Sequence, residues 1–213
     1  MDIHSENTLT FDPEEYFLSP DLRREASDKG RAMQGLYGGA KEELPPNAPE
    51  PRGRAVQINC FVDSDHAGDK LTRRSHTGII IYINKAPISW FSKKQNTVES
   101  STFGSEFVAL RLATEQLISL RYKLCMFGIP VEGYSNVFCD NESVFKNATI
   151  AESRLRKKHN SVCFHRVRES VASGILMAFK VDSKYNLSDI LTKALSSFDR
   201  LNMRKMIMPS HND

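Results

Sequence analysis

The sequence predicts an α/β domain with a mixed five-stranded sheet and helices on both faces. Five short segments have the apolar pattern of strands, and helical segments lie between the later ones. Their order is three strands, a helix, a strand, two helices, a strand and a final helix, which is typical of a layered α/β domain. The chain has 213 residues, of which 40% are hydrophobic and 26% charged, enough for a sizeable core. This pattern predicts the class without selecting one fold.

Three strands open the predicted domain. Apolar and polar residues alternate over residues 56–63, which predicts the first strand. The second strand is expected over 77–84 and the third over 86–92, and the short link Asn84–Lys85 suggests a hairpin between them. Trp90, in the third strand, is expected to pack in the core or on the hairpin rather than to stack on a base.

A long helix follows the hairpin. Ser100, Ser101 and Thr102 are candidate N-caps for it, and Gly128 and Pro130 end it. Apolar residues recur at helical spacing and predict a buried face. That face consists of Phe103, Phe107, Leu110, Thr114, Leu117, Leu120 and Leu124.

The remaining elements are shorter. A fourth strand is expected to stop at Asp140, and the last helix is expected to start near Ser188, with further helical sequence after Ser197. The fourth strand is expected over 136–139 and the fifth over 175–181. Between them, one helix is expected to begin at Asn141 and another to cover 159–173.

The first 54 residues are predicted to be an acidic, proline-rich leader that packs poorly. They hold a possible short helix over 22–33, and the prolines between Pro45 and Gly53 exclude a helix and favour a domain boundary. The domain itself is expected over residues 55–208, with a tail at 209–213.

Charge is distributed unevenly along the chain. Residues 1–50 carry a net charge of −6 and residues 51–213 a net charge of +9. A basic folded part fits a polyanionic partner such as nucleic acid, although a solvated basic surface explains the charge equally well.

Several classes of protein are excluded. No apolar run is long enough for a membrane helix, so no membrane partner is expected, and the N-terminus lacks the features of a signal peptide. The cysteines are widely spaced and form no zinc or disulfide pattern; we interpret them as reduced thiols of an intracellular protein, cytoplasmic or nuclear. They are Cys60, Cys125, Cys139 and Cys163.

Four acidic residues lie at the ends of predicted strands or near the starts of predicted helices. Asp63 ends the first strand, Glu106 lies one turn into the long helix, Asp140 ends the fourth strand, and Asp189 lies in the first turn of the last helix. Carboxylates gathered at one sheet edge repel one another unless a cation lies between them. Oxygen ligands without His or Cys suit Mg²⁺ or Mn²⁺, and two such ions can assist cleavage of a phosphodiester.

Each acid also has a structural interpretation. Asp63 could be a turn residue and competes with Asp65, which points to the same face. Glu106 could solvate a helix edge, Asp140 could cap the next helix, and Asp189 could be an acid favoured by the helix dipole. Singly these are reasonable, but together they leave the shared arrangement unexplained.

Seven segments, in order, resemble the RNase H region of copia-type retrotransposon Pol polyproteins. The resemblance covers roughly residues 43–208. The segments are D-S-D-H-A-G-D, R-R-S-H-T-G, I-S-W-F-S-K-K-Q, S-S-T-F-G-S-E-F-V-A-L, C-D-N-E-S-V, K-K-H-N and S-D-I-L-T-K-A-L.

The resemblance implies an RNase H-like fold and Mg²⁺-dependent endonucleolytic cleavage of the RNA strand of RNA–DNA hybrids. It assigns the catalytic, metal-binding acids to Asp63, Glu106, Asp140 and Asp189. It implies the hybrid as a partner, together with the reverse transcriptase portion of a parent polyprotein. Two alternatives stay open: a non-catalytic domesticated or decaying remnant that at most binds nucleic acid, and a nuclease or integrase of the same fold acting on DNA.

Basic segments beside the hairpin and before the helix predicted over 159–173 are candidate nucleic-acid contacts, since Lys and Arg position a hybrid through its phosphates. They comprise Arg73, Arg74, Lys93, Lys94, Arg156, Lys157 and Lys158. Ser64, Gln95 and Asn141 could contact 2′-hydroxyl groups. Some RNase H enzymes carry a His in the loop before the last acid, but residues 182–188 contain none, so no proton-transfer helper is identified.

Overall fold

The computed structural model describes residues 11–155 and 158–208. The strands are β1 (Ile58–Ser64), β2 (His76–Ile83), β3 (Ala86–Lys94), β4 (Ser135–Cys139) and β5 (Leu176–Lys180). They form one central five-stranded sheet with the order β3-β2-β1-β4-β5. The helices are α1 (Pro13–Phe17), α2 (Pro20–Leu36), α3 (Thr102–Met126), α4 (Glu142–Thr149), α5 (Ser161–Ala172) and α6 (Ser197–Ile207), with short 3-10 helices η1 (Lys158–Asn160), η2 (Ser183–Tyr185) and η3 (Leu187–Leu191).

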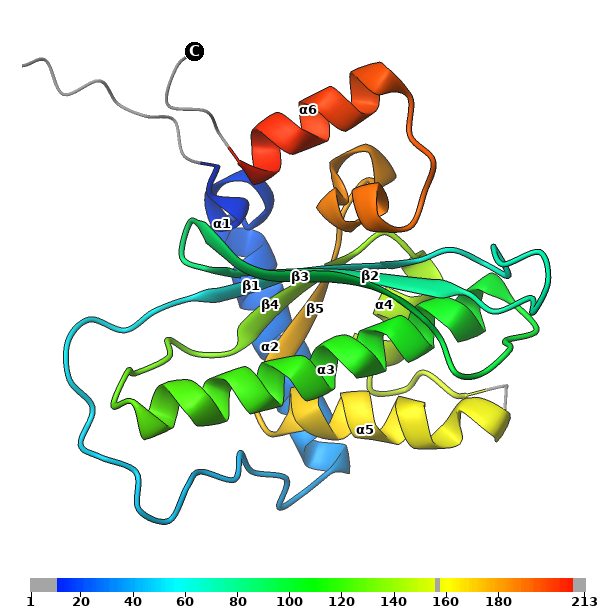
Figure 1. Cartoon of the computed structure of the whole chain (residues 1–213). Helices are drawn as coiled ribbons and strands as arrows, with labels where there is room; N and C mark the ends of the chain where they lie inside the picture. The colour runs from blue at the N-terminus through cyan, green and yellow to red at the C-terminus, as the bar shows by residue number, and fades with distance from the viewer. Residues whose placement is uncertain (1–10, 156–157, 209–213) are drawn as a thin grey trace, which may run out of the picture.

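The sheet is mixed, as predicted. β1, β2 and β3 form an antiparallel meander, whereas β4 runs parallel to β1, and β5 runs parallel to β4. Figure 1 shows α3 and α5 below the sheet and α1, η3 and α6 above it. All seven residues of β1 are buried, because this central strand is covered on both faces. The predicted class and sheet are therefore confirmed.

The long helix forms where its pattern predicts it. The side chain of Ser101 accepts a hydrogen bond from the backbone N–H of Gly104 and caps the N-terminus of α3. Gly128 follows the helix with a φ of 69°, a conformation that glycine adopts without strain. Phe107, Leu110 and Leu117 are fully buried against the sheet. α3 thus closes one face of the sheet and holds its first turn at a fixed place.

The opposite face holds a cluster of aromatic side chains. Phe61 on β1 stacks on Phe138 of β4, with ring centroids 4.9 Å apart. Phe11 and Phe17 cover Phe61 at centroid distances of 6.4 and 5.8 Å. Offset and edge-to-face pairs of this kind add to the free energy gained from burying apolar area. The segment that carries α1 is therefore part of the core.

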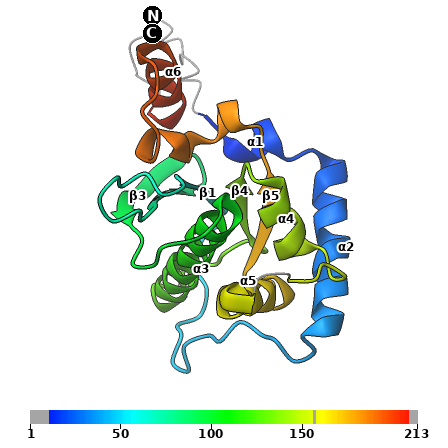
Figure 2. The same cartoon turned by 90° about the vertical axis from the view of Figure 1, so that its right-hand side faces the viewer.

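The prediction that residues 1–54 pack poorly is wrong for much of this segment. Besides Phe11, the side chains of Leu18, Ala26 and Met33 belong to the hydrophobic core, and Met33 is fully buried. Figure 2 shows α2 running alongside α4 and α5. Further along, the guanidinium of Arg121 makes two hydrogen bonds to Glu42, at 2.6 and 2.7 Å. A few well-spaced apolar residues dock this segment even though most of its surface is polar.

Two smaller expectations also fail. The helix predicted to start near Ser188 is the short 3-10 helix η3. A break at residues 192–196 separates it from α6, which begins at Ser197 and confirms the further helical sequence predicted there. Trp90 is 53% exposed, because it lies on the outward face of the edge strand β3 while Phe91 points inward. The four cysteines are free thiols, two of them buried. Among the described helices, none combines the length and apolarity that crossing a membrane requires.

Candidate metal centre

The register of two parallel strands places two carboxylates side by side. Phe61 of β1 pairs with Phe138 of β4, so Asp63 and Asp140, two residues further along each strand, occupy matching positions. Side chains two residues apart on a strand share a face. Asp63 is fully buried at the end of β1, and the side chain of Asp140 is 11% exposed just beyond β4. The carboxyl ends of β1 and β4 therefore present a pair of acids.

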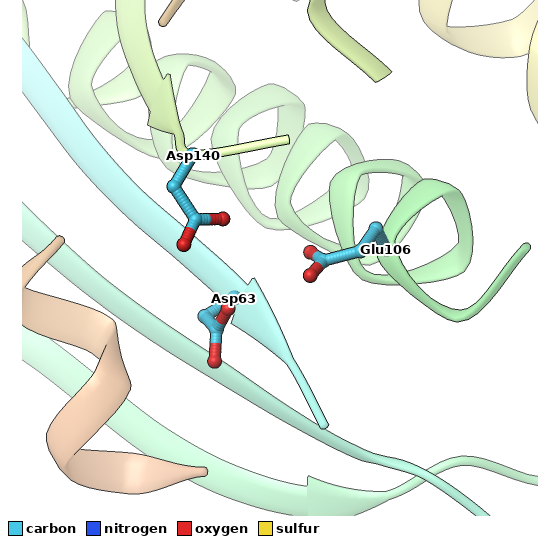
Figure 3. Close-up of side chains that lie close together, drawn as sticks. All are labelled: Asp63, Glu106 and Asp140. Atoms are coloured by element: carbon cyan, nitrogen blue, oxygen red, sulfur yellow. The ribbon is translucent and has the colours of Figure 1, made fainter. Parts of the chain in front are cut away.

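Glu106 completes the cluster from the first turns of α3. One carboxylate oxygen from each of Asp63, Glu106 and Asp140 lies within 4.8 Å of the other two. Figure 3 shows the three side chains pointing toward one another from β1, α3 and the end of β4. Such an all-oxygen set suits a hard divalent cation. Asp63 Oδ1 is buried, and the Lys193 ammonium nitrogen lies 3.4 Å from it.

Asp189 lies next to the cluster, on η3. Asp189 is buried, with 5% of the residue exposed, and it interacts electrostatically with Asp63 and Asp140. η3 reaches this place because Gly78 lies opposite Asp63 on β2. A Cβ atom at Gly78 would stand 2.8 Å from Thr192 Cγ2 and 2.9 Å from the carbonyl oxygen of Ser188. Because Gly78 has no side chain, η3 packs directly against the sheet.

Lys193 lies among the acids. Its ammonium nitrogen is 2.9 Å from Asp189 Oδ1, 3.4 Å from Asp63 Oδ1 and 3.7 Å from Asp140 Oδ2. The neighbouring Thr192 hydroxyl donates a hydrogen bond to Asp63 Oδ2. Sequence reasoning did not assign either residue to the site. The available signal was their position three and four residues after Asp189, which places them one helical turn away from that acid.

Other residues fill the roles that the structural interpretations gave to Asp63 and Asp140. Asp65 accepts hydrogen bonds from the backbone N–H and ring of His76, so its carboxylate is engaged in the loop after β1. The N-cap of α4 is Asn141, whose side chain accepts from the N–H groups of Ser143 and Val144. Asp140 therefore does not cap that helix. Both observations leave Asp63 and Asp140 free to face the cluster.

Burial and mutual repulsion perturb the acids. Burial, followed by the charges of Asp63 and Asp140, raises the pKa of Glu106 to about 9. Burial and the charge of Asp63 raise the pKa of Asp189 to about 7, and burial raises the pKa of Asp63. Burial lowers the pKa of Lys193, but Asp189, Asp63 and Asp140 outweigh it and hold that pKa above its ordinary value. In the metal-free protein, Glu106 and Asp189 therefore stay protonated at a higher pH than ordinary carboxylic acids do.

These shifts predict a pH dependence of the metal-free protein. Glu106 and Asp189 keep their protons to about pH 9 and about pH 7 in the folded state, whereas the unfolded chain loses them near its ordinary carboxylate pKa. The folded state then binds more protons, so the free energy of unfolding decreases as pH rises from about 5 to about 9. Denaturant unfolding with a chelator measures this slope. A Glu106→Gln variant should have a flatter profile; superimposed profiles would contradict the shift.

The candidate nucleic-acid residues lie mainly at the same end of the sheet. Lys93 pairs with Thr77, which pairs with Ser64 next to Asp63, and Arg73 lies exposed in the loop between β1 and β2. Arg74 is half-buried in that loop, and Lys94 forms an ion pair with Asp69. Lys158 is exposed at the start of η1, which contacts α3. Arg156 and Lys157 lie outside the described residues.

Two of the polar groups expected to contact a ligand are structural instead. Gln95 is buried, and its amide nitrogen donates to the hydroxyls of Ser64 and Thr77 and to the carbonyl of Ser105, at 3.3, 3.0 and 2.9 Å. Ser64 is buried as well. These bonds join the end of β1, the start of β2 and the first turn of α3. Gln95 therefore fixes Glu106 relative to Asp63, and its predicted contact with 2′-hydroxyl groups is wrong.

The chain is similar to a segment of transposon polyproteins. It is 31% identical over 145 residues to the retrovirus-related Pol polyprotein from transposon RE1 of Arabidopsis thaliana, which covers 68% of this chain and 10% of that protein. It is 32% identical over 138 residues to the one from transposon TNT 1-94 of Nicotiana tabacum, which covers 65% of this chain and again 10% of that protein. The chain thus spans about a tenth of the length of these relatives. No protein-family model matches it.

The fold is similar to that of solved RNase H structures. LC11-RNase H1, determined in complex with an RNA/DNA hybrid, aligns with a TM-score of 0.51 and 16% identity over 64% of this chain and 94% of that one. At this identity the match establishes the fold. Together with the sequence relatives, it shows that the chain belongs to the family of retrovirus-related Pol polyproteins from copia-type transposons, as their RNase H-like part.

Proposed function

We propose that this chain is a divalent-metal-dependent endonuclease that cleaves the RNA strand of RNA–DNA hybrids. The observation that carries the proposal is the convergence of Asp63, Glu106 and Asp140, whose oxygens lie within 4.8 Å of one another. Burial and oxygen-only donors suit Mg²⁺ or Mn²⁺. The family relationship and the solved hybrid complex of LC11-RNase H1 support the same substrate class.

The acids would bind the ion, and Thr192 would orient one of them. Asp63, Glu106 and Asp140 would hold the ion, with Asp189 at the rim as a further ligand. When bound, divalent ions supply the positive charge that activates a water and stabilises the leaving oxygen of a phosphodiester. The Thr192 hydroxyl orients the Asp63 carboxylate through its hydrogen bond, as outer groups do around metal ligands.

The surface around the acids suits a polyanion. Arg73 and Lys93 lie on segments that adjoin the end of β1, and Lys158 lies beside the N-terminus of α3. These cations can hold phosphates on either side of the cluster without reading sequence. A hybrid bound there would have its backbone directed over Asp63 and Glu106.

A comparison of substrates tests the proposal. The chain should cleave the labelled RNA strand of a hybrid with Mg²⁺ or Mn²⁺, and a chelator should stop the reaction. Duplex DNA and duplex RNA of the same sequence are the controls and should be cut at least about 100-fold more slowly, a difference that contacts to 2′-hydroxyls and duplex shape can supply. Binding of the hybrid without cleavage would instead identify a non-catalytic remnant, and preferred cleavage of duplex DNA would identify a different nuclease.

A further inference from the structure

The ammonium group of Lys193 lies among the acids next to the candidate metal cluster. It lies within 3.7 Å of carboxylate oxygens from Asp189, Asp63 and Asp140, which come from three different elements. Two of these three acids also belong to the cluster with Glu106. The carboxylates of Asp63 and Asp140 therefore lie next to both the ammonium and the third acid, Glu106.

Lys193 differs from the acids in what it can do there. A lysine ammonium has three donors and no acceptor, so it cannot be a metal ligand. It also carries a positive charge, which repels a divalent cation at short range. An ion that engaged Asp63 and Asp140 fully would have to compete with Lys193 for their oxygens.

The side chain has a route out of the cluster. The Lys193 side chain is 38% exposed, whereas those of its partners Asp63, Asp140 and Asp189 are 0%, 11% and 7% exposed. Its long flexible stem allows the ammonium to move into solvent while its backbone stays next to η3. The acids, held by strands and by η3, lack this freedom.

We propose that Lys193 is an internal counter-cation of the acid cluster, which holds the carboxylates together in the metal-free protein and is displaced when a divalent ion binds. This inference rests on the proposed function, because it takes the cluster to be a metal site. Lys193 is then a positioning residue that sets metal affinity: it keeps the site assembled but lowers the affinity for the ion.

Mg²⁺ binding to purified variants of the full chain, measured by calorimetry, tests this role. Lys193→Gln removes the competing charge and should lower the dissociation constant for Mg²⁺ by ~10-fold or more, since one unit charge a few ångströms away carries that much free energy at an intermediate dielectric. Lys193→Arg keeps the charge and should bind like the parent. Lys205→Gln, on the exposed surface of α6, removes the same charge away from the acids and should have no effect.

Thermal unfolding without metal gives a second readout. Lys193→Gln should melt below the parent and below Lys205→Gln, because the carboxylates lose their counter-charge. If the parent binds Mg²⁺ and Lys193→Gln binds it no more tightly, the inference is overturned while the proposed function stands. If neither the parent nor any variant binds Mg²⁺ or Mn²⁺, the metal site itself is wrong and the inference falls with it.

Discussion

Replacing Asp140 with Asn is expected to reduce hybrid cleavage at least about 10³-fold, because it removes one of the carboxylates that hold the ion. Asn is nearly the same size, so the change leaves the packing at the end of β4 in place. The N-cap of α4 is unaffected, since Asn141 makes it. The metal-free variant should be as stable as the parent or more so, because one of the mutually repelling acids is gone.

Two further measurements separate this role from a structural one. Mg²⁺ should raise the melting temperature of the parent, because it binds the folded cluster and not the unfolded chain, and this rise should shrink in Asp140→Asn. Glu142→Gln is the matched control: it removes an exposed carboxylate two residues away that pairs with Lys146 and Lys180. It should keep full cleavage. Equal cleavage by Asp140→Asn and the parent would exclude Asp140 from the site.

Replacing Met33 with Ala should lower the free energy of unfolding by about 2–5 kcal/mol, the range for truncating a buried Met. Met33 is fully buried, and Ala26, one heptad earlier, is 3% exposed on the same side of α2. Gly30 lies between them, and a Cβ atom there would be 3.3 Å from Met177 Cε of β5. The small residues let α2 approach the sheet closely, so Ala at 33 would leave a cavity.

Denaturant unfolding measures this loss, and the adjacent Gln34→Ala is its control. Gln34 is exposed on the same helix, and its replacement should change the free energy of unfolding by about 0.5 kcal/mol or less. If Met33→Ala proved as stable as Gln34→Ala, α2 would not be docked on the domain. Any loss of hybrid cleavage by Met33→Ala should match the fraction of the protein that is unfolded. Mg²⁺ should still raise the melting temperature of this variant as it does for the parent.

The acid cluster could be predicted because each acid stands at a recognisable end of an element. Asp63 and Asp140 follow apolar strand segments, and Glu106 follows the N-cap residues of the long helix by one turn. Parallel pairing of β1 and β4 then brings the ends together. Asp189 was harder to place, because a 3-10 helix of five residues has no long periodic pattern, and the sequence predicted an ordinary helix starting near Ser188.

The packing of the leader and the burial of residues in the third strand were predicted less well, for a common physical reason. α2 buries only Ala26 and Met33 among 17 residues, so its sequence contains no continuous apolar stripe. β3 has apolar residues on both faces, and the sequence does not show that Ile88 and Trp90 face outward on an edge strand while Phe91 faces inward. In both cases the packing partner, distant along the chain, determines which residues are buried.

The place of Lys193 depends on tertiary structure in the same way. A lysine after an apolar helical turn is ordinarily a solvated residue. Only the close contact of η3 with Gly78 brings Lys193 over Asp63. The spacing of Lys193 from Asp189 places the two one turn apart, but it does not show that Lys193 also lies against Asp63.

Asp63, Glu106 and Asp140 are proposed to form a divalent-metal site for phosphodiester cleavage. Anomalous diffraction from crystals soaked in Mn²⁺ can test for this site, since Mn²⁺ takes the same oxygen ligands as Mg²⁺ and can be located by its scattering. We expect an anomalous peak between these three carboxylates, with the Lys193 ammonium moved away from Asp63. Saturating Mn²⁺ that gave no peak there, with Lys193 still against the acids, would contradict it.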